Sequence, residues 1–484
     1  MKKITLLCAL LCGFATAQAK VTLPTVIASN AVLQQNESVK LWGEGTPNSK
    51  LTIRPSWTKQ KYTTQIAADG KWELPVETVA AGGPYTISFD DGEVTKIDNI
   101  MLGEVWLCFG QSNMRMAIYG NGGQPVEGLM DVLLQADSLI PIRYFRAELQ
   151  SAFEPKDDLE GNWKVNSPKS VKTLGATAYF FAQYLQSVLK VPVGVVECAW
   201  GGSKIEAWMS PDMLNEYKAG YPMPKSSKDF VNGKANNTAA QLYNGLLSPL
   251  KNLRFKGALW YQGESNLLNS DEYPALFKIF VESLREDHFD NGVFPFYYAQ
   301  IAPYGLNAAS GKNYNIRMRE TQAKMIDNVE RVGMVVLSDI GEEVCIHPRQ
   351  KKSVGNRFAY WALGDTYGYD MVDYRAPEFN TMRQLAANNK YPKRVGLNFK
   401  HAPLGLCFAD ANVPSVNFEV AGEDKVFYPA TARISNGNNH IEVWSDQVED
   451  IVAVRYGCRE YFKGDVFNSY GIPISSFRTD DWDL

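Results

Sequence analysis

The sequence has few histidines, few cysteines and no strongly basic segment. Of its 484 residues, 4 are histidine and 7 are cysteine, and no two cysteines have the spacing of a C-x-x-C motif. A zinc site of the Cys/His type has little to draw on, so we expect no bound metal. The formal net charge is −4, which gives no basic surface for a nucleic acid. Metal-dependent and nucleic-acid-binding classes are therefore disfavoured.

Long apolar runs are also missing, apart from one near the N-terminus. Two lysines precede an apolar stretch, residues 4–15, which ends close to a triplet of small residues. A membrane-spanning helix needs roughly 20 apolar residues, so the pattern predicts a cleaved signal peptide, residues 1–19. Cys8 and Cys12 each follow a leucine where a lipoprotein signal has a small residue, which disfavours a lipid anchor. We expect an exported protein, periplasmic or extracellular, that does not bind a membrane.

Removal of the signal peptide leaves an odd number of cysteines. The five that remain are Cys108, Cys198, Cys345, Cys407 and Cys458. An odd number cannot pair completely within one chain, although disulfides form readily outside the cytoplasm. The sequence leaves open whether Cys407 and Cys458 pair.

Turn residues and apolar segments divide the rest of the chain into three regions. In residues 20–98, short alternating strands are separated by turns such as Asp69-Gly70 and Asp91-Gly92, which predicts a β-sandwich. Residues 99–368 alternate apolar strands with helices, which indicates a parallel sheet in an α/β layer fold. Residues 369–484 return to short strands and predict a second β-rich region.

The middle region has the clearest elements. Its predicted strands are 105–109, 193–196, 257–260, 296–299 and 332–337. Its predicted helices are 178–189, 273–286, 317–329 and 352–363. In an open parallel sheet, ligands bind outside the carboxyl ends of the strands, so the residues that follow each strand are the first candidates for a site.

Small residues and hydrogen-bonding side chains follow the first three of these strands. The three segments are Gly110-Gln111-Ser112-Asn113-Met114, Trp200-Gly201-Gly202-Ser203 and Gln262-Gly263-Glu264-Ser265-Asn266. A serine on a tight strand-to-helix turn exposes its hydroxyl and aims its own backbone N–H at an incoming oxyanion. Ser112 fits this description, although a serine in an isolated G-x-S sequence more often caps the next helix.

The other two segments supply further hydrogen-bond donors. Gly202, or alternatively Gly201, brings a second backbone N–H close to the reacting oxygen, because glycine lacks the Cβ that would block the approach. The side-chain amide of Gln262 offers a third donor that stays neutral at every working pH. We therefore predict an oxyanion hole formed by Ser112, Gly202 and Gln262.

A serine nucleophile also needs a base, and the chain offers 4 histidines. His288 lies in a charged stretch typical of a solvated helix end, and His401 and His440 lie in the last β-rich region. His347 follows the fifth predicted strand and precedes a proline that stiffens its position. His347 is therefore the predicted general base, and activity should rise near pH 6.5 if the imidazole has an unperturbed pKa of about 6.5.

Four blocks occur in an order that is specific to one known family. They are Gly-Gln-Ser-Asn-Met at 110–114, Trp-Gly-Gly-Ser at 200–203, Trp-Tyr-Gln-Gly-Glu-Ser-Asn at 260–266 and Ile-His-Pro at 346–348. With these blocks the chain resembles the sialate O-acetylesterase family, and residues 30–35 and 471–473 extend the resemblance over nearly the whole chain. The resemblance implies a flavodoxin-like, three-layer SGNH-hydrolase core flanked by β-sandwich or β-rich regions, and no cofactor. It also implies that Ser112 is the nucleophile and His347 the base.

One departure from the SGNH pattern concerns the group that orients the histidine. Many SGNH enzymes have an aspartate two or three residues before it, whereas here these positions are Cys345 and Val344. Such a carboxylate normally orients the imidazole and stabilises its cation. The nearby candidates are Asp339, Glu342, Glu343 and, from another loop, Glu264, which equally fits a loop-supporting role. Otherwise a backbone carbonyl serves and leaves a Ser-His dyad, which is the interpretation that we slightly favour.

The resemblance implies a substrate and leaves two alternatives. The expected partner is an acetylated carbohydrate, a sialoglycan or free sialic acid, which is deacetylated through an acetyl-enzyme with release of acetate. One alternative is an acetyl esterase that acts on a plant polysaccharide, xylan or pectin. The other is a carbohydrate-binding protein without activity, which the missing aspartate would support.

Overall fold

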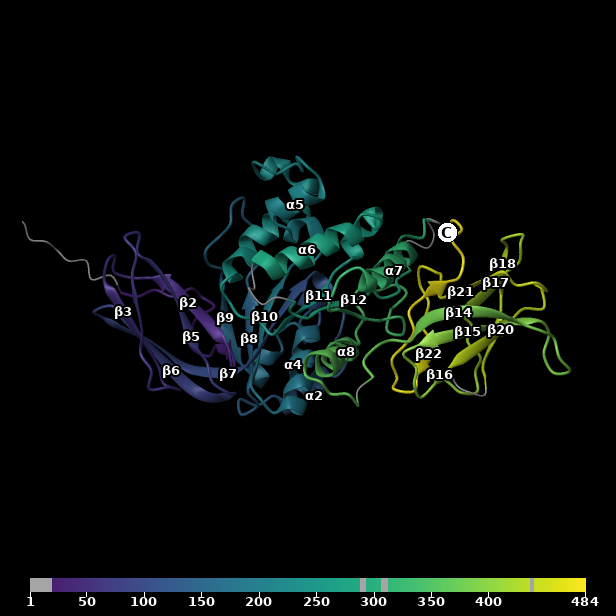
Figure 1. Ribbon diagram of the computed structural model, residues 1–484, viewed down its shortest axis with the longest axis horizontal. Helices are drawn as coiled ribbons and strands as arrows, with labels where there is room; N and C mark the ends of the chain where they lie inside the picture. Colours follow the sequence, from purple (N-terminus) through teal and green to yellow (C-terminus); the bar gives the residue numbers. More distant parts are fainter. Residues whose placement is uncertain (1–19, 288–292, 306–311, 372, 436–438) are drawn as a thin grey trace, which may run out of the picture.

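Three regions follow one another along the long axis of the molecule (Figure 1). The structure is a computed structural model, and it describes residues 20–287, 293–305, 312–371, 373–435 and 439–484. The predicted signal peptide, residues 1–19, and His288 lie outside the described residues. Within these ranges no helix has both the length and the apolar character needed to cross a bilayer.

The central region is a mainly parallel sheet between two layers of helices. Its strands follow the order β13-β12-β11-β7-β10-β8-β9, and only β9 runs antiparallel to its neighbour. Their bounds are β7 Val94–Gly110, β8 Ile142–Ala147, β9 Gly161–Val165, β10 Val193–Ala199, β11 Gly257–Tyr261, β12 Phe296–Ala299 and β13 Val332–Val335. This three-layer α/β architecture with flanking β-rich regions confirms the predicted fold class.

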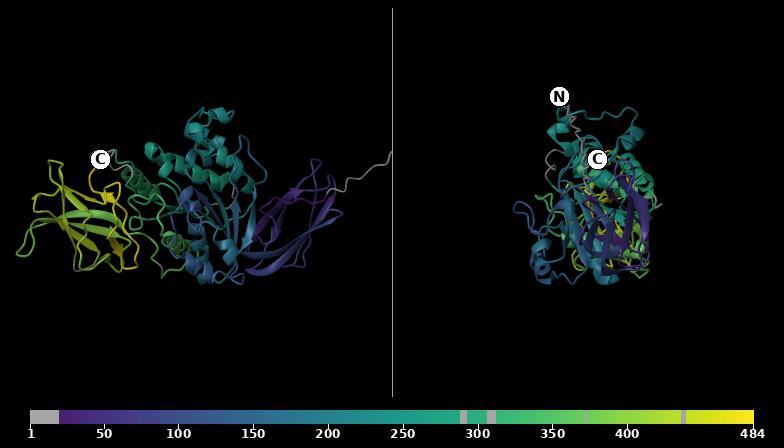
Figure 2. Two further views of the ribbon diagram at one scale, coloured as in Figure 1. Left: turned by 180° about the vertical axis from the view of Figure 1, so that it is seen from behind. Right: turned by 90° about the vertical axis from the view of Figure 1, so that its left-hand side faces the viewer.

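Helices cover both faces of this sheet (Figure 1, Figure 2). On one face α4 and α8 pack against each other, and on the other α5, α6 and α7 lie over the sheet. The helices are α1 Ser112–Arg115, α2 Leu129–Gln135, α3 Pro168–Val171, α4 Ala176–Leu189, α5 Pro211–Tyr217, α6 Tyr273–Asp287, α7 Tyr314–Lys324 and α8 Lys351–Trp361. The four predicted helices correspond to α4, α6, α7 and α8.

The apolar run of β7 explains why this strand is central. Side chains alternate between the two faces of a strand, so a strand that is covered on both faces is apolar throughout. Val105, Leu107 and Phe109 are fully buried in the core under α6, whereas Trp106 and Cys108 are fully buried in the core under α4 and α8. Burial on both faces fixes the end of β7, and with it the position of the next residues.

The N-terminal region shares a strand with the central region. Its strands are β1 Val32–Gln34, β2 Ser38–Glu44, β3 Lys50–Pro55, β4 Tyr62–Gln65, β5 Lys71–Glu77 and β6 Gly82–Asp90. Residues 94–102 of β7 pair with β6, and residues 104–110 of the same strand pair with β10 and β11. The boundary expected between residues 98 and 99 therefore falls inside a continuous strand.

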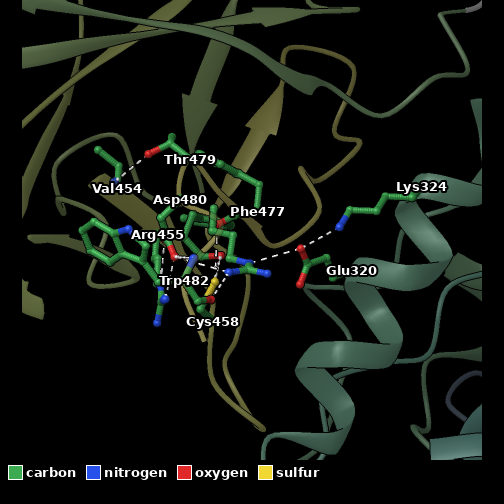
Figure 3. A network of polar contacts seen from close by, with 11 residues as sticks. Glu320, Lys324, Val454, Arg455, Cys458, Phe477, Thr479, Asp480 and Trp482 are labelled. Carbon is green, nitrogen blue, oxygen red and sulfur yellow. Dashed lines mark hydrogen bonds and ion pairs between the residues drawn. The ribbon is translucent and has the colours of Figure 1, made fainter. Parts of the chain in front are cut away.

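Among the residues that the structure describes, the C-terminal region shares no strand with the central region and contacts it through backbone and side-chain hydrogen bonds. Two of these bonds run from the Tyr304 N–H to the Glu460 carbonyl at 3.1 Å and from the Gly464 N–H to the Ser338 carbonyl at 2.8 Å. Its strands are β14 Glu378–Leu385, β15 Arg394–Lys400, β16 Leu406–Phe408, β17 Phe418–Ala421, β18 Phe427–Pro429, β19 Thr431–Ile434, β20 His440–Trp444, β21 Ala453–Tyr456, β22 Val466–Asn468 and β23 Phe477–Arg478. Arg478 binds Glu320 of α7 at 3.1 Å, and Lys324 binds the same carboxylate at 2.9 Å (Figure 3). The buried Arg319 of α7 donates to the Glu460 carbonyl at 3.2 Å.

Two details differ from the sequence analysis or resolve what it left open. Strands β8 and β9 had not been predicted, because arginines interrupt the apolar pattern of β8. All five described cysteines are free thiols, so Cys407 and Cys458 are not paired.

Candidate active site

Ser112 lies on the turn that follows β7, at the carboxyl edge of the central sheet. Gly110 ends the strand with a φ of +128°, and a Cβ there would stand 2.3 Å from the Tyr261 carbonyl oxygen. Only glycine fits both the conformation and the space. The four-residue helix α1 begins at Ser112, and the Met116 N–H donates to the Ser112 carbonyl at 2.7 Å. The tight turn presents the Ser112 side chain at the sheet edge.

The structure brings Ser112 and His347 together across 235 residues of sequence. The Ser112 Oγ lies 2.8 Å from the His347 Nε2, which is a hydrogen-bond distance. The other ring nitrogen, Nδ1, lies 2.6 Å from Oε1 of Gln124. The imidazole is thus held between a hydroxyl and a side-chain amide, and this arrangement is the one that a serine nucleophile and its base require.

The surroundings of His347 keep its imidazole neutral. Burial, followed by the positive charge of Lys351, lowers the pKa of His347 from 6.5 to about 4. The expectation that activity rises near pH 6.5 assumed an unperturbed pKa, and the buried site does not meet that assumption. A neutral imidazole is able to accept the serine proton over a wider acidic range.

Three backbone amides on the Ser112 and Gly201-Gly202 segments have no hydrogen-bond partner among the described residues. In the described part of the chain, no hydrogen bond occupies the N–H of Ser112, Gly201 or Gly202. A Cβ on Gly201 would stand 3.3 Å from the Ser112 Cβ, so the two segments are in close contact. The Asn236 side chain donates to the Gly201 carbonyl at 2.8 Å and fixes this segment. The oxyanion-hole roles of Ser112 and Gly202 remain predictions that this geometry allows.

Gln262 does not offer the free donor that the sequence analysis expected. Its amide nitrogen donates to the Ser203 carbonyl at 2.9 Å and to Oδ1 of Asn266 at 2.7 Å, which uses both N–H bonds. Its amide oxygen accepts from the Tyr273 hydroxyl at 2.7 Å. The side chain is fully buried. Gln262 therefore ties neighbouring segments together, and the prediction of a third oxyanion donor is corrected on this point.

Glu264 supports the nucleophile segment and makes no hydrogen bond to the histidine. Its Oε1 accepts from the Asn113 amide at 2.6 Å, and the Asn113 oxygen accepts from the Lys351 ammonium at 2.5 Å. Burial raises the pKa of Glu264 and lowers that of Lys351 to about 7. Asn113 directly follows Ser112, so these hydrogen bonds fix the segment that contains Ser112. The loop-supporting alternative for Glu264 fits this structure, and the orienting alternative does not.

The other candidate carboxylates are also turned away from His347. Asp339 binds the Arg357 guanidinium through both oxygens, at 2.8 and 2.7 Å. Glu342 binds Arg349 at 3.0 Å. Among the described residues no carboxylate hydrogen-bonds to His347, and the place of the missing aspartate is taken by the amide of Gln124.

A pocket of about 220 Å³ opens beside Ser112. Its lining residues are Ser112, Arg115, Met116, Ala117, Tyr119, Gly120, Asn121, Arg146 and Gly201. Two arginines face one buried carboxylate, because Arg146 and Arg115 lie 3.2 and 3.8 Å from Glu197. A larger cavity of about 660 Å³ lies between the N-terminal and central regions, and neither Ser112 nor His347 lines it. Of these two cavities, only the smaller is lined by Ser112.

Gln124 and Asn236 were not predicted from the sequence. Gln124 ends the tetrapeptide Asn-Gly-Gly-Gln at 121–124, and Asn236 lies in a segment of short 3₁₀ turns. Neither segment has a periodic apolar pattern. The double glycine does signal a tight turn, which is the one local sign that Gln124 occupies a fixed position.

The α/β fold and the contact between Ser112 and His347 fit an esterase, and comparison with known proteins gives its family. The family model described as carbohydrate esterase, sialic acid-specific acetylesterase matches residues 102–363. The chain belongs to this family. The enzyme is an esterase that hydrolyses O-acetyl esters on sialic acid or another acetylated sugar.

Individual relatives agree with this family. Sialate O-acetylesterase of Mus musculus is 25% identical over 413 residues, covering 74% of this chain and 75% of the relative. The Homo sapiens enzyme of the same name is 27% identical over 383 residues, covering 72% of each chain. The crystal structure of a carbohydrate acetylesterase from Xanthomonas citri aligns with a TM-score of 0.83 and 30% identity, covering 96% of this chain and 100% of that chain.

Proposed function

We propose that Ser112 attacks the acetyl carbonyl and that His347 acts as its general base. The observation that carries this proposal is the 2.8 Å contact between Ser112 Oγ and His347 Nε2. The imidazole takes the serine proton as the new C–O bond forms, and it gives that proton to the oxygen of the departing sugar alcohol. Water then attacks the acetyl-enzyme, its proton passes through the same imidazole to Ser112, and acetate leaves.

Backbone amides stabilise the oxyanion in this proposal. The amides of Ser112 and Gly202, with Gly201 as the alternative to Gly202, are free and lie on segments fixed by the rest of the fold. Such donors act where negative charge develops, and each one typically contributes about 3 kcal/mol to the transition state.

The proposed substrate is an O-acetylated sialic acid, free or at the end of a glycan. The mammalian relatives named above are called sialate O-acetylesterases. Two guanidinium groups, those of Arg115 and Arg146, line the pocket beside Ser112. Sialic acid carries a carboxylate, which guanidinium groups bind well. The backbone of xylan carries no such charge.

We further propose that the enzyme acts outside the cytoplasm. The support is the pattern of residues 1–19, with two lysines, a short apolar stretch and a small-residue triplet. N-terminal sequencing of the secreted or periplasmic protein should begin at Lys20. A full-length protein that stays in the cytoplasm would contradict this proposal.

The catalytic proposal is tested with Ser112→Ala and a matched serine control. Release of acetate from O-acetylated sialic acid should fall by about 10⁴-fold or more in Ser112→Ala, with an unchanged circular dichroism spectrum. Ser265→Ala, on the Gln262 segment, should keep nearly the wild-type rate. A Ser112→Ala enzyme that keeps its rate would refute the proposed nucleophile.

The substrate proposal is tested on the wild-type enzyme. Acetate release should be faster from O-acetylated sialic acids than from acetylated xylan or pectin at equal acetyl concentration. The reverse order would overturn the sialic acid proposal and leave the roles of Ser112 and His347 intact.

A further inference from the structure

We propose that Gln124 is the positioning residue of the general base: its side-chain carbonyl binds the Nδ1–H of His347 and so directs Nε2 to Ser112. This inference rests on the proposed roles of Ser112 and His347. It adds a third member to the reacting group, and that member is a neutral amide where many SGNH enzymes have a carboxylate.

The two contacts of the imidazole determine its tautomer. The ring lies 2.6 Å from Gln124 Oε1 through Nδ1 and 2.8 Å from Ser112 Oγ through Nε2. A carbonyl oxygen only accepts hydrogen bonds, so Nδ1 has to carry the proton. Nε2 then has a free lone pair, which is the form that accepts the serine proton. If Gln124 presented its NH₂ group instead, Nε2 would carry the proton and could not act as a base.

A tight turn fixes Gln124 in place. The N–H of Asn121 donates to the Gln124 carbonyl at 2.9 Å, and the N–H of Gln124 donates back to Asn121 at 2.8 Å. The two central residues, Gly122 and Gly123, have φ values of +53° and +87°, as a type I′ turn requires. Gly120 packs so closely against this turn that a Cβ there would stand 2.2 Å from the backbone carbonyl oxygen of Gln124. The Asn-Gly-Gly-Gln sequence thus builds a rigid support for one side chain.

No charged side chain among the described residues hydrogen-bonds to Nδ1 of His347, where the Gln124 amide lies. Glu342 is bound to Arg349, and Glu264 is bound to Asn113 beside the buried Lys351. The Cys345 thiol lies 3.3 Å from the His347 carbonyl oxygen, on the backbone side of the residue. Lys351 is therefore the charge that acts on the imidazole, and it is positive.

A neutral partner has a chemical consequence. During the reaction the proton moves from Ser112 Oγ to Nε2, while the proton on Nδ1 stays in its hydrogen bond to Gln124. The resulting imidazolium faces a carbonyl dipole and no carboxylate, so it is a stronger acid than in a Ser-His-Asp triad and gives its proton readily to the sugar oxygen. Because Gln124 is neutral, it adds no negative charge that would oppose burial and Lys351, which lower the pKa of His347.

The test replaces Gln124 with its charged isostere and follows the pH dependence of kcat/KM. A carboxylate next to Nδ1 favours the imidazolium, so Gln124→Glu should move the acidic limb of the profile upward by about one pH unit or more. Gln124→Leu should lower kcat/KM about 10- to 100-fold, because the ring loses the acceptor that fixes its tautomer. Gln135→Glu, an exposed change at the end of α2, adds the same charge outside the site and should leave the limb in place.

A spectroscopic readout keeps the test independent of turnover. In ¹⁵N spectra of the wild-type protein without substrate, His347 should be protonated on Nδ1, and Gln124→Leu should lose this preference. An unchanged acidic limb in Gln124→Glu, or an imidazole protonated on Nε2 in the wild type, would overturn the role of Gln124. Loss of the proposed nucleophile would be seen separately, as full activity in Ser112→Ala.

Discussion

Two polar networks meet at Ser112, and they use similar side chains for different purposes. The proposed reacting group consists of Ser112, which lines the pocket, and of His347 and Gln124, and all three side chains are only partly buried. The supporting cluster (Asn113, Gln262, Glu264 and Lys351) lies behind it, hydrogen-bonded and largely out of reach of solvent. Each network contains a glutamine amide, but one amide has all its bonds inside the protein and the other presents a single oxygen to the histidine.

The comparison shows that burial and partners decide what a side chain does. A buried amide must have its hydrogen bonds satisfied inside the fold, so it becomes structural. The buried Lys351 and Glu264 lie within one cluster, where each partly offsets the charge of the other. The following predictions separate the two networks, in order of decreasing effect.

The largest effect is expected from Gln262→Leu, which should lower stability. The change leaves the Ser203 carbonyl and the Tyr273 hydroxyl without this partner, and each buried unsatisfied group costs about 1 to 3 kcal/mol. We expect the free energy of unfolding, measured in urea, to fall by about 3 kcal/mol or more. The matched Gln124→Leu should fall by less than about 1 kcal/mol. Full stability of Gln262→Leu with a rate loss of about 100-fold would instead make Gln262 an oxyanion donor.

A smaller effect is expected from Lys351→Met, in the pH dependence of stability. The folded-state pKa of Lys351 is about 7, below its usual value of 10.5. Between these two values the unfolded chain holds a proton that the folded chain has lost, so this group makes the wild type more stable as pH rises from about 7 to 10.5.

The measurement is the difference in unfolding free energy between Lys351→Met and the wild type at several pH values. This difference should change in favour of the wild type by at least about 1.4 kcal/mol, the equivalent of one pKa unit, between pH 7 and 10. Parallel curves for the two proteins would show that Lys351 titrates normally.

The smallest effect concerns the acidic limb of the pH–rate profile. In the wild type, kcat/KM for a generic acetyl ester should fall only as pH drops through about 4, the pKa of His347. Lys351→Met removes the second cause of the lowered pKa and leaves burial, so the limb should move upward by less than about one unit. A wild-type limb near 6.5 would show that the pocket does not hold the imidazole in its neutral form.

Local pattern predicted that Ser112 and His347 lie together, and the structure shows them in contact. Ser112 lies two residues after the end of the strand whose last part, residues 105–109, is apolar throughout, and the chain has 4 histidines as candidates for the base. Their contact, at 2.8 Å, needed no further information than the position of both residues at the carboxyl edge of the sheet.

Long-range partners decided what local pattern did not predict. Arg143 and Arg146 make β8 look polar, yet Arg146 pairs with the buried Glu197 of the neighbouring strand β10. Gln124 lies 223 residues before His347, so nothing near either residue signals their contact. Gln262 was assigned as a donor from its residue type, and only the packing of Ser203, Asn266 and Tyr273 around it shows that its bonds are used.

The 17-residue strand β7 restricts how this enzyme is able to evolve or be engineered. The same strand begins beside β6 in the N-terminal region and ends at Gly110, two positions before Ser112. A cut near residue 98 would remove the β6 partners of Ile97, Ile100 and Leu102 and leave this part of β7 as an unpaired sheet edge. The N-terminal region is therefore not an independent domain, and an engineered version of the central region has to include it.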